Sequence, residues 1–98
     1  MSIPELSIPE DGTALTLRWP GEAPRRIPAS ALRHAARDAQ SIRHRHDFGD
    51  IPIRPGLHLT GMEPVGVMGV NIRFSDGCVR AIYPWDYLRE IVARVSIN

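Results

Sequence analysis

The stretch "VNIRFSDGCVRAIYPWDYL", residues 70–88, predicts a β-hairpin that leads into a helix. Its first run places Val70, Ile72 and Phe74 on one side of an extended strand and polar residues on the other. Asp76-Gly77 separates this run from a second strand-like run, "CVRAIY", and an Asp-Gly pair between two such runs is a strong hairpin signal. Pro84 suits the first turn of a helix. The residues after it predict the buried stripe of that helix: Trp85, Leu88, Ile91, Val92 and Val95.

The N-terminal third of the chain predicts further strands. Residues 1–12 contain two prolines and end at an Asp-Gly turn, so we expect an extended arm or an edge strand. "TALTLRW", residues 13–19, alternates between apolar and polar positions, which indicates a half-buried strand. "APRRIPA", residues 23–29, can return as a short strand at an edge, where the missing N–H groups of its prolines do no harm.

The middle of the chain predicts a helix, a loop and another strand. Ser30 is the expected N-cap, and the helix is expected to end near Ile42. Polar residues with Pro and Gly at 43–56 predict a surface loop, and residues 57–66 predict a strand with an irregular end at Glu63-Pro64. The helix would bury a narrow apolar stripe: Leu32, Ala35, Ala36 and Ala39.

These elements predict an α+β fold, a mostly antiparallel small sheet with two helices in the order strands, helix, strands, helix. The length of 98 residues is that of a single domain, which we expect to span residues 1–98. We expect the helices to cover one face of the sheet.

Charge and composition exclude several classes of protein. The chain has 12 basic and 11 acidic residues, so its net charge of +1 gives no reason to expect nucleic-acid binding. One cysteine rules out an internal disulfide framework. The N-terminus has neither a basic nor an apolar region typical of a signal peptide, and no apolar run is long enough to span a membrane. We therefore expect a soluble, cytoplasmic domain.

The only cysteine, Cys78, raises the question of catalysis. A cysteine nucleophile needs a nearby base, usually histidine, and the sequence does not tell which of its four histidines would approach Cys78. The simplest interpretation of a single cysteine at a hairpin is a small, half-buried apolar residue. We expect no catalytic residues and no enzyme activity.

Metal binding is a second possibility. His44 and His46 lie one residue apart beside Asp47, and two such histidines can share a metal when their segment is extended. Further ligands would have to come from Cys78 or His34. An iron–sulfur cluster needs about four thiolates, which this chain alone does not supply.

Basic residues in and after the first predicted helix suggest an interaction patch for an acidic partner. Since a charged helix face is usually just solvated, the patch is a weak hypothesis. Its members are Arg33, Arg37, Arg43 and Arg45. Four of the six aromatic residues could form a ligand cage, but are expected instead to fill the core: Trp19, Tyr83, Trp85 and Tyr87.

Across residues 13–92, the order and spacing of short motifs resemble the gamma-butyrobetaine-hydroxylase-like N-terminal domain family. This family is a small module of unknown function. The motifs that carry the resemblance are Leu15 to Trp19, Leu32-Arg33, Pro64-Val65-Gly66, Phe74-Ser75-Asp76-Gly77, Ile82-Tyr83 and Leu88-Arg89.

The resemblance implies a structural zinc in some relatives, held by three helix cysteines and by the histidine that follows Asp-Gly. In this sequence those four positions fall on Ala36, Asp38, Ser41 and Cys78. The three cysteines are missing and the fourth ligand has changed type, so the zinc site is expected to be degenerate and the fold to need no cofactor. His34, His44 and His46 are weaker candidates for binding zinc or iron.

The resemblance also suggests a role. The family precedes the catalytic domain of gamma-butyrobetaine and trimethyllysine dioxygenases, and it occurs fused to Mrp-type ATPases that carry iron–sulfur clusters. We therefore expect a stand-alone, non-catalytic accessory module that binds an unknown protein partner, linked to iron–sulfur or oxygenase systems, with no nucleic acid and no membrane as partner. The alternative is a small metal-binding protein that uses Cys78 with nearby histidines.

Overall fold

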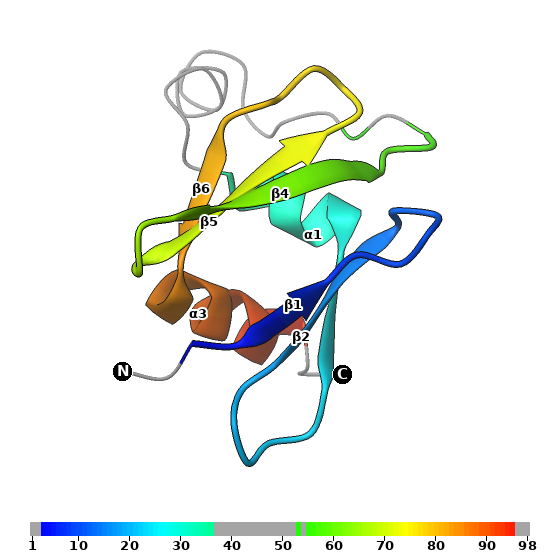
Figure 1. The fold of residues 1–98 in the computed structure, drawn as a ribbon. Coiled ribbons are helices and arrows are strands. Elements are labelled where there is room, and N and C mark those ends of the chain that lie inside the picture. The colour runs from blue at the N-terminus through cyan, green and yellow to red at the C-terminus, as the bar shows by residue number, and fades with distance from the viewer. Residues whose placement is uncertain (1–2, 37–52, 54, 96–98) are drawn as a thin grey trace.

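Two antiparallel three-stranded sheets and two helices make up the part of the chain that the computed structural model describes, residues 3–36, 53 and 55–95 (Figure 1). The α+β class and the order strands, helix, strands, helix are confirmed, with the strands divided between two sheets. The elements are β1 (Glu5–Ser7), β2 (Ala14–Arg18), β3 (Arg25–Pro28), α1 (Ala29–His34), β4 (Leu59–Val65), β5 (Gly69–Phe74), β6 (Ala81–Pro84) and α3 (Trp85–Val95). No helix within the described residues is long and apolar enough to cross a membrane.

The first sheet has the strand order β1-β2-β3, so β3 is an edge strand as predicted. Leu15 pairs with Ile27 and Leu17 with Leu6 across the ladders. Leu15, Leu17 and Ile27 are fully buried, whereas Arg18 is exposed. The alternation in "TALTLRW" therefore turns one face of this sheet to the core.

The second sheet has the order β4-β5-β6, and its central strand confirms the alternation predicted for residues 70–74. Val70, Ile72 and Phe74 are buried, while Arg73 is exposed. The predicted irregularity at Glu63-Pro64 is wrong: β4 pairs regularly with β5 there, since an edge strand tolerates the missing N–H of proline. The register shifts instead between Leu59 and Gly61, where a Cβ on Gly61 would lie 2.5 Å from the Arg73 guanidinium.

The connection between β5 and β6 is longer than predicted, and Cys78 lies within it rather than in a strand. The turn closes when Phe74 N–H donates to the Cys78 carbonyl at 2.7 Å, with Gly77 at φ 95°. After this turn, the Val79 carbonyl and the Ala81 N–H bond to the Asn71 side chain in place of a backbone group of β5. The Asn71 amide donates to the Val79 carbonyl at 3.2 Å and accepts from Ala81 N–H at 3.0 Å. β6 therefore begins only at Ala81.

Helix α1 starts differently from the prediction. Ser30 is the second residue of the helix and not its N-cap; Pro28 occupies that position without a side-chain hydrogen bond. One of the N–H groups that a helix start leaves without an intrahelical acceptor, that of Ala29, donates instead to the Thr13 carbonyl at 2.8 Å. The described helix ends at His34, and the remainder of the predicted helix and the predicted loop fall in residues 37–52, outside the described part.

Helix α3 begins at Trp85, one residue after the predicted Pro84, which ends β6. One core cluster collects side chains from both sheets and both helices. The four aromatic residues Trp19, Tyr83, Trp85 and Tyr87 are all buried in it, which confirms that they fill the core.

Gly12 joins the two sheets. Its carbonyl accepts a hydrogen bond from Leu59 N–H at 2.7 Å, at the start of β4. Its φ of 68° lies in the left-handed region, and a Cβ added there would come 2.6 Å from the Leu59 carbonyl oxygen. Any larger residue must therefore push the two sheets apart.

We predict that Gly12→Ala lowers the free energy of unfolding by about 2–4 kcal/mol, because it combines backbone strain with a clash. Gly21→Ala is the matched control, since Gly21 has a φ of 76° with nothing within 4 Å of the added Cβ. The control should lose only about 1 kcal/mol from left-handed strain. Urea unfolding of both variants measures the difference, and equal losses would contradict the role of Gly12 as the link between sheets.

Candidate functional site

The C-terminal end of α1 meets the β5–β6 connection in a corner built from residues far apart in the chain. Arg33 Nε donates to Asp76 Oδ2 at 2.7 Å across 43 residues of sequence. Both side chains are only 12% exposed, so the pair is largely shielded from water. The guanidinium also lies 5.8 Å from the centre of the Phe74 ring, within range of a cation–π contact.

Asp76 fixes the position of Cys78. Its other oxygen, Oδ1, accepts a hydrogen bond from Cys78 N–H at 3.1 Å. Burial alone would raise the pKa of Asp76, but the hydrogen bonds from Arg33 and from Cys78 N–H, with the charge of Arg33, outweigh it and hold the pKa below its ordinary value. The carboxylate is thus ionised at neutral pH and acts as a structural acceptor, which does not suit a general acid.

Two tyrosines hold the other side of the corner. The Tyr83 hydroxyl donates to the Leu32 carbonyl at 2.5 Å, and the Tyr87 hydroxyl donates to the Ala35 carbonyl at 2.6 Å. Their rings are stacked with centroids 6.1 Å apart. The Leu32 carbonyl also accepts a hydrogen bond from Ala35 N–H at 3.1 Å, so the tyrosine adds a second donor there. The two tyrosine bonds tie α1 to β6 and α3.

Two of the four zinc-ligand positions implied by the family resemblance lie in the described part of the chain, and both lie near this corner in sequence. Ala36 is fully buried and its methyl group has no donor atom. Cys78 is half-buried and packs against the core. Asp38 and Ser41 lie outside the described residues. Because alanine supplies no ligand atom, the four implied positions hold at most three donors, which does not fit a four-coordinate zinc. Within residues 3–36, 53 and 55–95, no three His, Cys, Asp or Glu side chains converge on a possible metal.

Of the other predicted binding residues, His34 and Arg33 lie in the described part of the chain. His34 is exposed and borders a shallow hollow together with Arg94 of α3. Arg33 forms the ion pair with Asp76 described above, and the hypothesis of a basic patch stays a prediction. The remaining candidates fall among residues that the structure does not describe: Arg37, Arg43, His44, Arg45, His46 and Asp47.

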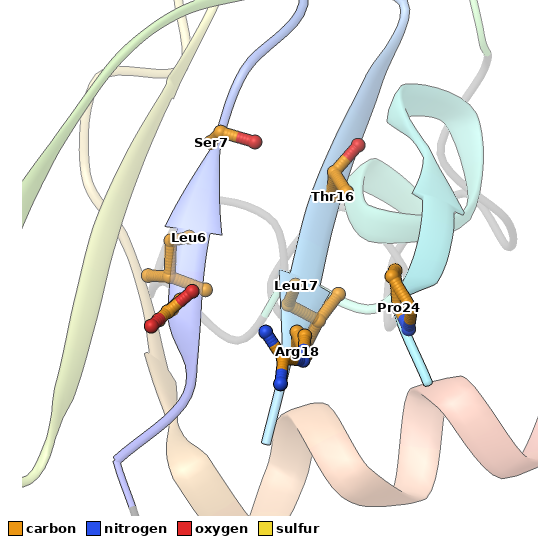
Figure 2. Close-up of a pocket in the computed structure, with 7 residues that line it drawn as sticks. Leu6, Ser7, Thr16, Leu17, Arg18 and Pro24 are labelled. Atoms are coloured by element: carbon orange, nitrogen blue, oxygen red, sulfur yellow. The ribbon is translucent and has the colours of Figure 1, made fainter. Parts of the chain in front are cut away.

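One shallow hollow, about 250 Å³ in volume, lies on the first sheet (Figure 2). Ser7 of β1 and Thr16 of β2 are paired across the ladder, and Glu5 is paired with Arg18 in the same way. The close-up shows Ser7 on β1 and Thr16 and Arg18 on the neighbouring strand β2, on open strands rather than inside an enclosed cavity. The hollow offers hydroxyl and charged groups, but none of the described residues that line it is a histidine or a cysteine.

A second hollow, of about 300 Å³, lies where the β2–β3 turn meets α3. Arg89 lies 4.2 Å above the Trp19 ring and binds the Glu22 carboxylate with two nitrogens, at 2.9 and 2.5 Å. The hydrogen bond from Arg89 lowers the pKa of Glu22. The charges of Arg89 and Glu22 therefore form an ion pair, which connects the β2–β3 turn to α3.

Sequence reasoning missed the Arg33–Asp76 pair, although both residues were visible in the motifs that carry the family resemblance. Leu32-Arg33 and Ser75-Asp76-Gly77 are the segments that the ion pair joins. The motifs gave the residues, but nothing in their spacing indicated that they touch.

Comparisons with known proteins identify relatives with the same fold. The family model described as "Gamma-butyrobetaine hydroxylase-like, N-terminal" matches residues 6–89. A crystal structure of a protein of unknown function of the DUF971 family, from Acidithiobacillus ferrooxidans, has a TM-score of 0.71 and 22% identity over 92% of each chain. No curated protein matches the chain.

Two further proteins with solution NMR structures have the same fold. One is 30% identical, with a TM-score of 0.73, and the match covers 98% of this chain and 77% of that one. The other is 17% identical, with a TM-score of 0.75, and the match covers 97% and 72% of the two chains.

We predict that Asp76→Asn lowers the free energy of unfolding at neutral pH by about 2–3 kcal/mol, because it removes a charged hydrogen-bond acceptor from Arg33. The pKa of Asp76 is lowered by folding, so its contribution is present above the unfolded pKa, about 3.9, and is lost as pH falls through the lower folded pKa. Urea unfolding at several pH values should therefore bring wild type and variant together in acid.

Glu63→Gln is the control for this prediction. Glu63 pairs with Arg73 at 2.9 Å, but the side chains are 49% and 45% exposed. Its loss should cost less than about 1 kcal/mol. A loss for Asp76→Asn no larger than that of the control would refute the structural role of Asp76.

Proposed function

We propose that this chain, which belongs to the gamma-butyrobetaine hydroxylase-like N-terminal family, is a non-catalytic accessory module that binds a protein partner. The observation that carries the proposal is an uncovered apolar surface. Among the described residues six large hydrophobic side chains are exposed, and five of them belong to the second sheet and its connections: Val65, Val67, Met68, Val79 and Ile82.

The register of the second sheet places two of these five residues, Val65 and Ile82, on the same side of it. Val70 and Ile72 face the core, so the residues that alternate with them along β5, together with the residues paired opposite those, face away from it. Asn71 is opposite both Glu63 and Ile82, and Gly69 is opposite both Val65 and Pro84. We call this side of β4-β5-β6 the outer face. Isolated exposed hydrophobic residues are ordinary, but a concentration on one side of a sheet suits protein binding.

The two most exposed of the five hydrophobic residues, Val67 and Met68, lie in a turn whose backbone is held by hydrogen bonds. Val67 is 72% and Met68 is 69% exposed at the β4–β5 turn. Trp85 holds this turn with two donors: its indole Nε1 donates to the Val67 carbonyl at 2.8 Å, and its backbone N–H donates to the Met68 carbonyl at 3.1 Å. A surface ordered before binding loses less conformational entropy when it meets a partner.

The corner around Cys78 supports a structural rather than a chemical role. The Asp76 carboxylate is already bonded to Arg33 and to Cys78 N–H, and the described residues bring no set of metal-binding side chains together there. The similar protein from Acidithiobacillus ferrooxidans is likewise one of unknown function. A small metal-binding protein that uses Cys78 with His34, His44 or His46 is the alternative function.

We further propose that the partner belongs to an iron–sulfur or oxygenase system in the cytoplasm. Support for the oxygenase comes from the description of the family, which names a hydroxylase. The iron–sulfur link rests on the motif resemblance alone. Both are hypotheses about the identity of the partner, and the binding surface does not depend on them.

The proposal predicts that capture of a partner depends on the β4–β5 turn. Tagged wild type, the double variant Val67→Asp/Met68→Asp and the control Ile3→Asp should be compared on extract from the source organism. Ile3 is 50% exposed and lies outside the outer face, before β1, so it controls for placing an aspartate at an exposed apolar position. We expect a specific protein bound by wild type and control and lost at least tenfold by the double variant. A partner retained by the double variant would refute this surface.

A further inference from the structure

Of the two methionines that the structure describes, Met68 is much the more exposed. Its side chain is 69% exposed in the β4–β5 turn, whereas Met62 of β4 is half-buried and packs against the core cluster. The third methionine of the chain, Met1, lies outside the described residues. Because an oxidant must reach the sulfur atom, Met68 is the described methionine that an oxidant in solution meets first.

The backbone of the turn keeps this side chain outside the core. Met68 N–H donates to the Val65 carbonyl at 3.3 Å, and the Met68 carbonyl accepts from Trp85 N–H at 3.1 Å. The next residue, Gly69, lies so close to β6 that a Cβ added there would come 2.5 Å from the Tyr83 carbonyl oxygen. Burying the Met68 side chain would require these contacts to break, so the side chain stays open to solvent.

We propose that Met68 is a site of reversible oxidation that releases the partner from the β4–β5 turn. This inference rests on the proposed function, because Val67 and Met68 are the most exposed part of the binding surface. A peroxide transfers one oxygen atom to the Met68 sulfur: the O–O bond breaks, an S–O bond forms, the sulfur loses two electrons, and the peroxide leaves as water or an alcohol. A dithiol reverses the step through a methionine sulfoxide reductase, since two thiols become a disulfide and the oxygen leaves as water.

The product changes the turn from apolar to polar. A sulfoxide has a polar S–O bond whose oxygen accepts hydrogen bonds, so its burial against an apolar partner that offers no donor is unfavourable. The fold does not need to change, because the Met68 side chain is mostly in solvent. Oxidation of Met62 would instead place the same polar group against the core cluster. Selective oxidation of Met68 therefore weakens binding and leaves the fold intact.

Peroxide treatment of the untagged chain tests the site without any partner. Fragment-ion mass spectrometry over a time course should show that Met68 gains one oxygen atom at least fivefold faster than Met62. Dithiothreitol then returns a reversibly oxidised Cys78 to the thiol, and a methionine sulfoxide reductase should restore Met68. The urea unfolding midpoint should stay the same while only Met68 is oxidised. Met62 that reacts as fast as Met68 overturns the inference.

Capture from extract of the source organism tests the release. The tagged chain is oxidised, cleared of peroxide and only then mixed with extract. Oxidised wild type should hold at least fivefold less partner than untreated wild type, and the reductase should restore the difference. Met62→Leu should respond to peroxide as wild type does, whereas capture by Met68→Leu should be the same before and after treatment.

The outcomes separate this inference from the proposed function. Wild type that keeps its partner after Met68 is oxidised overturns the inference and leaves the proposed function standing, and so does a Met68→Leu variant whose capture still falls with peroxide. A wild type that captures no protein even before treatment refutes the proposed function, and the release with it.

Discussion

The hydroxyl of the fully buried Tyr83 donates to the Leu32 carbonyl at 2.5 Å, and the placement of α1 depends on this bond and its neighbour from Tyr87. The described helix has six residues and no side-chain cap at its start. A helix this short is not stable alone in water. Its position must therefore come from tertiary contacts, and the two stacked tyrosines supply them at the end that faces the β5–β6 connection.

Once α1 is held, Arg33 can reach Asp76, and Asp76 in turn fixes the backbone of Cys78. The family resemblance places metal ligands at this corner in some relatives, through positions that here include Ala36 and Cys78. In this chain the same segments are joined by a shielded ion pair and by tyrosine hydrogen bonds. We expect these interactions to hold the corner without a metal. They also support the outer face from behind, since Tyr83 belongs to β6.

The strands and the second helix could be predicted from the sequence because their burial follows local periodicity. Val70, Ile72 and Phe74 alternate with exposed residues, and α3 carries its buried residues at helical spacing. The start of α1 could not be predicted, because the Thr13 carbonyl, distant in sequence, replaces the cap expected of Ser30. The start of β6 was missed for a similar reason, since the Asn71 side chain takes over backbone pairing.

For the candidate site, the sequence indicates which residues are of interest, but it does not indicate which of them contact one another. The sequence suggests Arg33 as part of a basic interaction patch, and the structure shows in addition that it pairs with Asp76, 43 residues away. No local pattern encodes such a pair. The exposed Val67 and Met68 follow Gly66 in a turn, where the alternation that identifies buried positions no longer applies.

Chemical unfolding of tag-free protein, with and without a strong chelator, tests most directly whether the corner is held without a metal. Metal bound only by the native state stabilises it, so removing a structural metal must lower the unfolding midpoint. We expect the same midpoint in both conditions and no stoichiometric zinc or iron by elemental analysis of the same sample. A stoichiometric metal whose removal lowers the midpoint, in wild type but not in Cys78→Ala, would contradict the account.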